Sequence, residues 1–176
     1  MQWLLCEGMI TMNIIIKVAI IVTYLFSVGC SSGSANTVDK ARLFFNKHYQ
    51  ELHEIKQTLL KHPNIERVSP GRKLEFTPSY KNFSSEDIIA YKALIAKCEE
   101  LDVLNITNYR IDNNNGEKLL IIRYVIYSIG LSPSGRSVSI NFIPNQLFVE
   151  RLEDNETTYY PLDVVDWYVA EYISNN

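Results

Sequence analysis

Residues 119–129 read LLIIRYVIYSI, and this run decides the fold. Isoleucine, valine and tyrosine favour strands, and the run holds too many of them for a helix. It shows no alternation of polar and apolar residues, so we expect a central strand whose two faces are both apolar.

The segments on either side of this run predict further strands of an antiparallel sheet. DNNNG at 112–116 predicts a hairpin turn after a strand at 106–111, and SPSG at 132–135 predicts a second turn. Residues 137–143 alternate, with Val138, Ile140 and Phe142 on one face. We expect other strands at 65–68, 73–77, 147–152, 157–160 and 165–173, although the last segment also fits a short helix.

The first part of the chain after residue 36 has helical periodicity instead. Apolar residues recur at three- and four-residue steps over 37–62, and Pro63 ends this run. A second helix is predicted from Ser84, where the sequence SSED is typical of a capping box. We therefore expect an α+β fold in which two N-terminal helices pack on one face of an antiparallel β-meander of about four to six strands.

The N-terminal thirty residues differ in composition from the rest. Residues 18–28 form an apolar run of eleven residues after Lys17, which suits a signal peptide and is shorter than the ~20 residues of a membrane span. A start at Met12 would place Lys17 directly before this run. We therefore expect residues 1–11 to lie upstream of the true translation start.

The apolar run ends in LFSVGC, residues 25–30, which resembles the lipobox of bacterial lipoproteins. Gly29 and Cys30 match the family's pattern, whereas Ser27 stands where the family usually has leucine. The resemblance implies a signal peptide at 1–29, cleavage between Gly29 and Cys30, and lipid on Cys30 that anchors the chain in a membrane. An uncleaved anchor helix and cleavage after Ala35 are the alternatives.

Residues 30–36 then form the lipidated cysteine and a flexible tether, and 37–176 form a single globular domain. By the same family's rule, Ser31 after the cysteine favours the outer membrane, facing the periplasm, over the inner membrane. Only Cys98 lies within the domain, so no internal disulfide can form. A net charge of −3 argues against nucleic acid as a partner.

Motifs that would indicate catalysis or a cofactor are missing from the sequence. His53-Glu54 begins like a zinc-protease motif, but Gln57 stands where the second histidine must be. Cys98 falls on the apolar stripe of the second helix, which favours packing over a nucleophile. The sequence therefore favours a non-enzymatic domain with no metal and no cofactor.

Aromatic residues near the C-terminus are the most suggestive binding feature, because tyrosine and tryptophan are enriched at interfaces. Packing at the sheet edge and in the core is the alternative. A predicted hairpin tip adds two polar residues, so the candidate surface is Tyr159, Tyr160, Trp167, Tyr168, Ser134 and Arg136.

These features favour a membrane-anchored envelope lipoprotein whose small domain binds an unknown envelope protein, in the manner of an immunity protein or inhibitor. The alternative is a small hydrolase or ligand-binding domain with a pocket between helices and sheet. The domain is loosely similar to small uncharacterised bacterial proteins, which share a long strand and an ending like Trp167-Tyr168; this resemblance implies no function.

Overall fold

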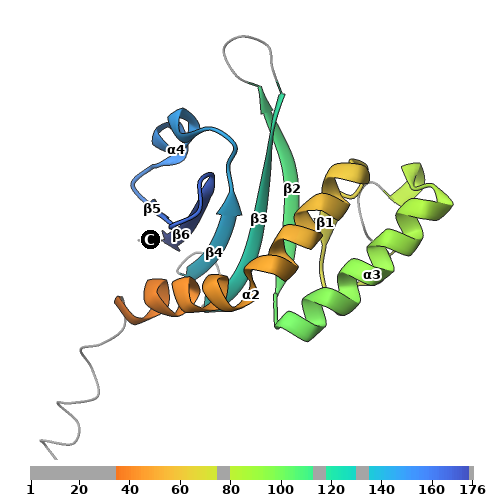
Figure 1. Ribbon diagram of the computed structural model, residues 1–176, viewed down its shortest axis with the longest axis horizontal. Coiled ribbons are helices and arrows are strands. Elements are labelled where there is room, and N and C mark those ends of the chain that lie inside the picture. The colour runs from red at the N-terminus through yellow and green to blue at the C-terminus, as the bar shows by residue number, and fades with distance from the viewer. Residues whose placement is uncertain (1–34, 75–79, 113–117, 130–134, 175–176) are drawn as a thin grey trace, which may run out of the picture. The chain divides into compact units, whose positions relative to one another are not determined.

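The computed structural model describes residues 35–74, 80–112, 118–129 and 135–174 (Figure 1). Contacts group Thr37–Asn176 into one compact unit, apart from Met1–Asn36. The predicted signal peptide, its cleavage site at Gly29 and Cys30, and most of both predicted hairpin turns lie outside the described residues. Within the described part, no helix is both long and apolar enough to cross a membrane.

The fold is α+β, and its centre is a six-stranded antiparallel sheet, as predicted. The strand order is β1-β2-β3-β4-β6-β5, and every neighbouring pair is antiparallel. The apolar run that decided the fold class lies in β3, which pairs with β2 and β4. The strands are β1 Arg67–Val68, β2 Asn105–Asp112, β3 Lys118–Ile129, β4 Arg136–Phe142, β5 Thr157–Pro161 and β6 Trp167–Ile173.

Two long helices precede most of the sheet in the sequence. Helix α2, Ala35–Lys61, has one residue with non-helical dihedral angles, His48. Helix α3, Ser85–Leu101, begins with the capping box that the sequence predicted: Ser84 Oγ accepts from the Asp87 amide, and the Asp87 carboxylate accepts from the Ser84 amide. It ends at Asp102, whose positive φ of 59° closes the last turn.

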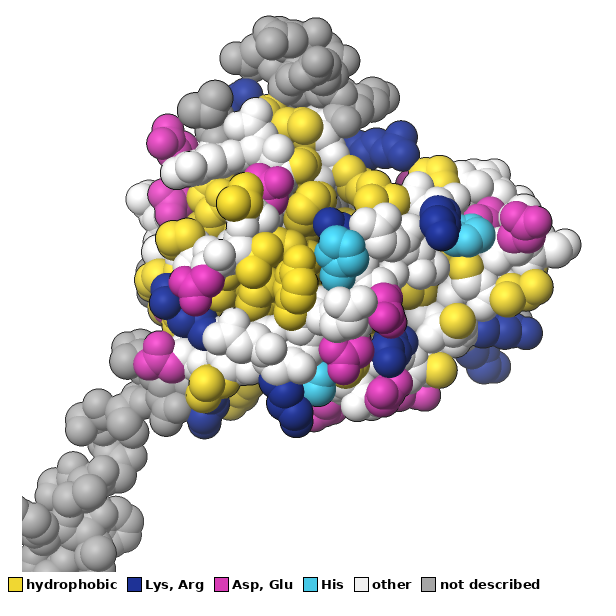
Figure 2. All heavy atoms as spheres, viewed as in Figure 1, with side chains coloured by type: hydrophobic (Ala, Val, Ile, Leu, Met, Phe, Trp, Pro, Cys, Tyr) yellow, Lys and Arg dark blue, Asp and Glu magenta, His cyan; other side chains and the backbone are white. Residues whose placement is uncertain are grey.

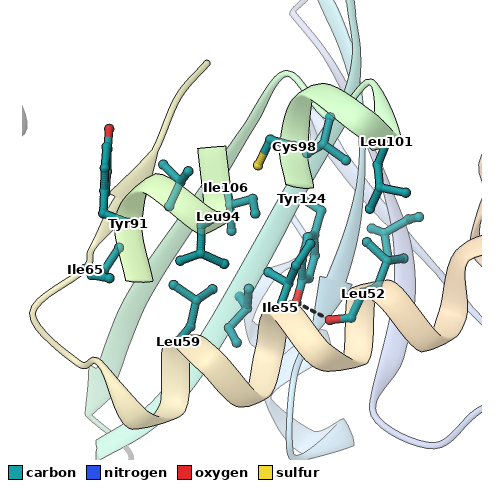
Figure 3. Packing of buried hydrophobic residues seen from close by; sticks show 14 of the residues in the cluster. Leu52, Ile55, Leu59, Ile65, Tyr91, Leu94, Cys98, Leu101, Ile106 and Tyr124 are labelled. Atoms are coloured by element: carbon teal, nitrogen blue, oxygen red, sulfur yellow. Dashed lines mark hydrogen bonds between the residues drawn. The ribbon is translucent and has the colours of Figure 1, made fainter. Parts of the chain in front are cut away.

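One large hydrophobic cluster contains residues of α2, α3 and the sheet (Figure 3). The hydroxyl of Tyr124 on β3 donates to the backbone carbonyl of Leu52 on α2 at 3.0 Å, so a buried polar group is satisfied across the cluster. The apolar stripe of α2 is buried as its spacing predicted. The stripe residues buried here are Ala41, Phe45, Leu52, Ile55 and Leu59.

The predicted strand at 147–152 is wrong, because these residues belong to helix α4, Gln146–Leu152. Phe148, Val149 and Leu152 are spaced for one face of a helix turn, and they pack against Ile121 and Tyr168 on the sheet. A short apolar run fits the helical period and the strand period equally well, so its sequence does not distinguish the two. The sheet is therefore no simple meander: β4 pairs with β6, and β5 lies outside β6.

The polar side of β4 is buried because α4 and its cluster lie on that face. Ser139 and Asn141 are both buried there, although their alternation with apolar residues suggested a polar face. Arg123 of β3 donates from Nε to Ser139 Oγ at 3.2 Å, and Asn141 Nδ2 donates to the same hydroxyl at 3.0 Å. These hydrogen bonds satisfy the buried polar groups.

Candidate functional site

A pocket of about 330 Å³ lies between α4 and the loop that joins β5 to β6. We call it the Trp167 pocket. It brings together three of the four aromatic residues that the sequence singled out, and three carboxylates from two separate segments. These residues are Tyr159, Trp167, Tyr168, Glu150, Asp163 and Asp166.

The aromatic residues make the pocket a rigid part of the fold. Trp167 is 2% exposed, and its ring lies 5.2 Å from that of Phe45 on α2 and 5.8 Å from that of Tyr124 on β3. Tyr168 is buried, and Tyr159 is half-buried. Burial raises the pKa of Tyr159 to about 12.

The other candidate residues do not belong to this pocket. Tyr160 points to the other face of the sheet from Tyr159, where it packs against the cluster of Ala41, Val138 and Val169, because successive strand residues alternate in direction. Ser134 lies outside the described residues.

Arg136 is not at an exposed tip as predicted but in β4, where Nε donates to Glu171 at 2.8 Å and Nη2 donates to Thr37 at 2.6 Å. Its guanidinium therefore joins the start of α2 to the sheet.

The rim of the pocket combines negative charge with an exposed apolar side chain. Val165 is 84% exposed at the tip of the loop, between Asp163 and Asp166. Figure 2 shows hydrophobic side chains gathered on the face that carries α4 and the C-terminal strands, with acidic side chains beside them. Among the described residues that line the pocket, none is a lysine, arginine or histidine.

The loop adopts a tight turn that sets the direction of Asp166. The Trp167 amide donates to the Val164 carbonyl at 3.2 Å, and Asp166 has φ +68° at the third position of this turn. Glycine usually takes this conformation, and aspartate is among the few other residues that tolerate it. Asp166 therefore contributes a carboxylate where a glycine would contribute none.

Lys56 of α2 approaches the same region from the core side. Its ammonium lies 4.3 Å from the centre of the Phe142 ring and 5.9 Å from that of Trp167, and the residue is 9% exposed. Desolvation lowers the pKa of Lys56, and the Asp166 carboxylate opposes that shift. A cation thus already lies against the aromatic cluster behind the pocket.

The edge strand beside the pocket presents no free amide for strand addition. The residues of β5 whose backbone faces away from β6 are Thr157, Tyr159 and Pro161. The Thr157 amide donates to Asp154 Oδ1 at 2.6 Å, the Tyr159 amide donates to Glu153 Oε1 at 3.2 Å, and proline has no amide hydrogen. These occupied amides favour a partner that binds side chains at this edge over one that extends the sheet.

The structure also brings together His62 and Asp87, which the sequence analysis did not connect. His62 Nδ1 lies 2.8 Å from Asp87 Oδ1, and Asn64 Nδ2 donates to Asp87 Oδ2 at 3.2 Å. The hydrogen bond from the Ser84 backbone, followed by that from His62, lowers the pKa of Asp87. Among the described residues no hydrogen bond joins His62 to a serine, threonine or cysteine, so the pair serves as a link between the end of α2 and the start of α3. The capping-box aspartate was the available signal, but its histidine partner follows only from the packing.

The cysteine and the histidines show no catalytic or metal arrangement in the described part of the chain. Cys98 is 0% exposed, and burial raises its pKa to about 12, which suits packing rather than nucleophilic attack. No group of three or more His, Cys, Asp or Glu among the described residues is placed to hold a metal ion. Comparisons with protein-family models, curated proteins and solved structures found no match for this chain.

Proposed function

We propose that this chain is a bacterial envelope lipoprotein, held on a membrane by lipid on Cys30, whose α+β domain binds a protein partner in the Trp167 pocket. The function is non-enzymatic and of the immunity or inhibitor kind. The observation that carries this proposal is the pocket itself, which is lined by three carboxylates together with aromatic side chains and an exposed valine.

The chemistry of the pocket specifies the partner segment. Carboxylates without a lining cation favour a segment with lysine or arginine, since oppositely charged groups across an interface steer and orient association. Buried aromatic walls favour an apolar or aromatic anchor beside that charge. The partner segment is therefore basic and amphipathic, and it contacts side chains because the neighbouring strand edge is capped.

We also infer that α2 and α3 together cover one face of the sheet. Leu52, Leu94 and Tyr124 share one hydrophobic cluster, which supports this arrangement. It would leave the Trp167 pocket, at the β5–β6 loop, available to a partner.

Site-specific photo-cross-linking in the native host tests partner binding. A photoreactive residue at position 165 should give one discrete adduct, because Val165 lies at the pocket rim. The matched control is position 89, since Ile89 is an exposed apolar residue on α3 away from the pocket. The double variant Glu150→Gln/Asp163→Asn should reduce the adduct at 165. Equal adducts at 165 and 89, or an adduct unaffected by the double variant, would contradict the proposal.

Lipid attachment has a separate test. Cys30→Ala should abolish incorporation of labelled palmitate and leave the precursor uncut, because the thiol of Cys30 is the group that the lipobox resemblance assigns to the lipid. Cys98→Ala is the control, since that thiol is buried in the domain. Equal label in the wild type and in Cys30→Ala would refute the anchor while leaving the pocket proposal standing.

A further inference from the structure

A second hollow lies at the opposite edge of the sheet, beside β1. It has a volume of about 520 Å³, and its lining combines the turn after β1 with the residues that lead into β2. Among the described residues that line it, three are cations, Arg67, Arg72 and Lys73, and none is an aspartate or glutamate. This concentration of positive charge occurs in a chain whose net charge is −3.

The three cations are not used by ion pairs within the described part of the chain. The ion pairs found there involve other residues: their basic members are His48, His62, Lys97 and Arg136. Arg67 uses only Nε, which donates to Ser69 Oγ at 3.2 Å, and that hydroxyl keeps its own hydrogen to donate. Three cations at one hollow raise the local positive potential, which attracts an anion.

A tight turn fixes where these side chains begin. The Arg72 amide donates to the Ser69 carbonyl at 3.2 Å, Pro70 takes the second position, and Gly71 takes the third with φ +74°. This is the geometry of a type II turn, which proline and glycine both favour. A Cβ on Gly71 would meet nothing within 4 Å, so the space above the turn is open.

We propose that this hollow binds a phosphate-type oxyanion, either a soluble phosphate or the phosphate of an anionic lipid headgroup. The guanidinium groups of Arg67 and Arg72 offer planar pairs of donors that match two oxygens of a phosphate. Lys73 adds a compact positive charge, and Ser69 and Asn105 add neutral polar groups. The two sources share this chemistry, and separate experiments distinguish them.

Calorimetric titration of the full chain in a neutral detergent tests the site. Inorganic phosphate is the first probe, and mixed micelles that carry phosphatidylglycerol or phosphatidylcholine are the second. Binding of phosphate supports a soluble ligand, binding of phosphatidylglycerol micelles but not phosphatidylcholine micelles supports a headgroup, and both together support the shared site. Binding of neither probe overturns the proposal.

A pair of charge-matched variants shows whether binding occurs at this hollow. Arg72→Gln/Lys73→Gln should weaken binding of the active probe by about tenfold or more, because it removes two charged donors. Lys40→Gln/Lys92→Gln removes the same charge from exposed positions that do not line the hollow, and it should change binding by less than about twofold. Equal losses in the two variants would mean that only the total charge matters, and would overturn the site. Circular dichroism of each variant confirms folding.

Discussion

The two edges of the sheet carry similar turns and opposite charges. At the β1 edge, the turn Ser69-Pro70-Gly71-Arg72 places Gly71 at φ +74° beside three cations. At the other edge, the turn before β6 places Asp166 at φ +68° beside two further carboxylates. The backbone geometry is nearly the same, so the difference in chemistry comes from the side chain at the third position and from its neighbours.

The two sites also differ in how they are connected to the core. Trp167, Tyr168 and Val149 line the acidic pocket and are buried, whereas every residue that lines the cationic hollow is exposed or half-buried. A change inside the acidic pocket should therefore alter stability as well as binding. Replacing a charged side chain of the hollow should alter binding with little effect on stability, because these side chains are exposed.

The largest expected effect is a difference in stability between a substitution in the acidic pocket and one in the cationic hollow. Trp167→Ala should destabilise the domain by roughly 3–5 kcal/mol, because it removes a ring packed against Phe45, Tyr124 and Phe142. Leu104→Ala should cost less than about 0.5 kcal/mol, because Leu104 lines the hollow and is 46% exposed. Denaturant unfolding of the full chain in neutral detergent, followed by circular dichroism, measures both. Similar midpoints for the two variants would remove the contrast between the two linings.

The sequence predicted those parts of the fold that depend on a long, clear period. The stripe of α2, the capped start of α3 and the long strand β3 each extend over many residues, so hydrophobic spacing determines them. Helix α4 was predicted wrongly as a strand, because its seven residues are too few to show a helical period. Asn145 directly before it was the signal to use, since asparagine is a favoured residue at the start of a helix.

The candidate site was predictable only in part. Aromatic content singled out Tyr159, Trp167 and Tyr168, but Glu150 lines the same pocket only because α4 packs against the sheet, and Asp163 lines it from the loop between β5 and β6. The cationic hollow was missed for a similar reason. Arg67 and Arg72 are close in sequence, yet the pocket between them needs Leu104 and Asn105 from the start of β2.

The next effect concerns the hydrogen-bonded group around Asp87, which links the end of α2 to the start of α3. Asp87 accepts hydrogen bonds from Ser84 and Asn64 and pairs with His62, so Asp87→Asn should destabilise the domain by about 1–2 kcal/mol at neutral pH. Glu86→Gln, in the same helical turn but exposed, should change stability by less than about 0.5 kcal/mol. Thermal or denaturant unfolding at neutral pH measures both.

Acid should remove this contribution of Asp87. Its pKa is lower in the folded state than in the unfolded state, so the charged carboxylate stabilises the fold fully above the ordinary pKa of about 4. This stabilisation declines as the pH falls further towards the folded-state pKa. The difference in stability between the wild type and Asp87→Asn should therefore shrink below about pH 4. A constant difference down to about pH 2 would show that the Asp87 charge contributes nothing.

A smaller effect compares the two turns directly. Gly71→Ala should cost about 1 kcal/mol, because alanine pays a backbone penalty at positive φ even though its Cβ meets no atom. Leu74→Ala, just after the turn, is unsuitable as a control, because Leu74 packs against the core and its loss would itself lower stability. The suitable control is Lys73→Ala, which leaves the turn intact and should change unfolding little. If Gly71→Ala unfolds like the wild type, the turn is not held at positive φ in solution.

The smallest expected effect on stability occurs at the matching position of the acidic edge. Asp166→Asn should change the free energy of unfolding by less than about 0.5 kcal/mol, because asparagine tolerates positive φ as well as aspartate does. Binding should respond differently, since the variant removes one of three carboxylates from the Trp167 pocket. The cross-link at position 165 should therefore weaken while unfolding stays the same, and Asp39→Asn on the exposed side of α2 should affect neither measurement. The equivalent turn position at the other edge, Gly71, has no side chain and therefore no charge to remove. An undiminished cross-link in Asp166→Asn would mean that the turn holds Asp166 away from the partner, and the charge of the pocket would then rest on Glu150 and Asp163 alone.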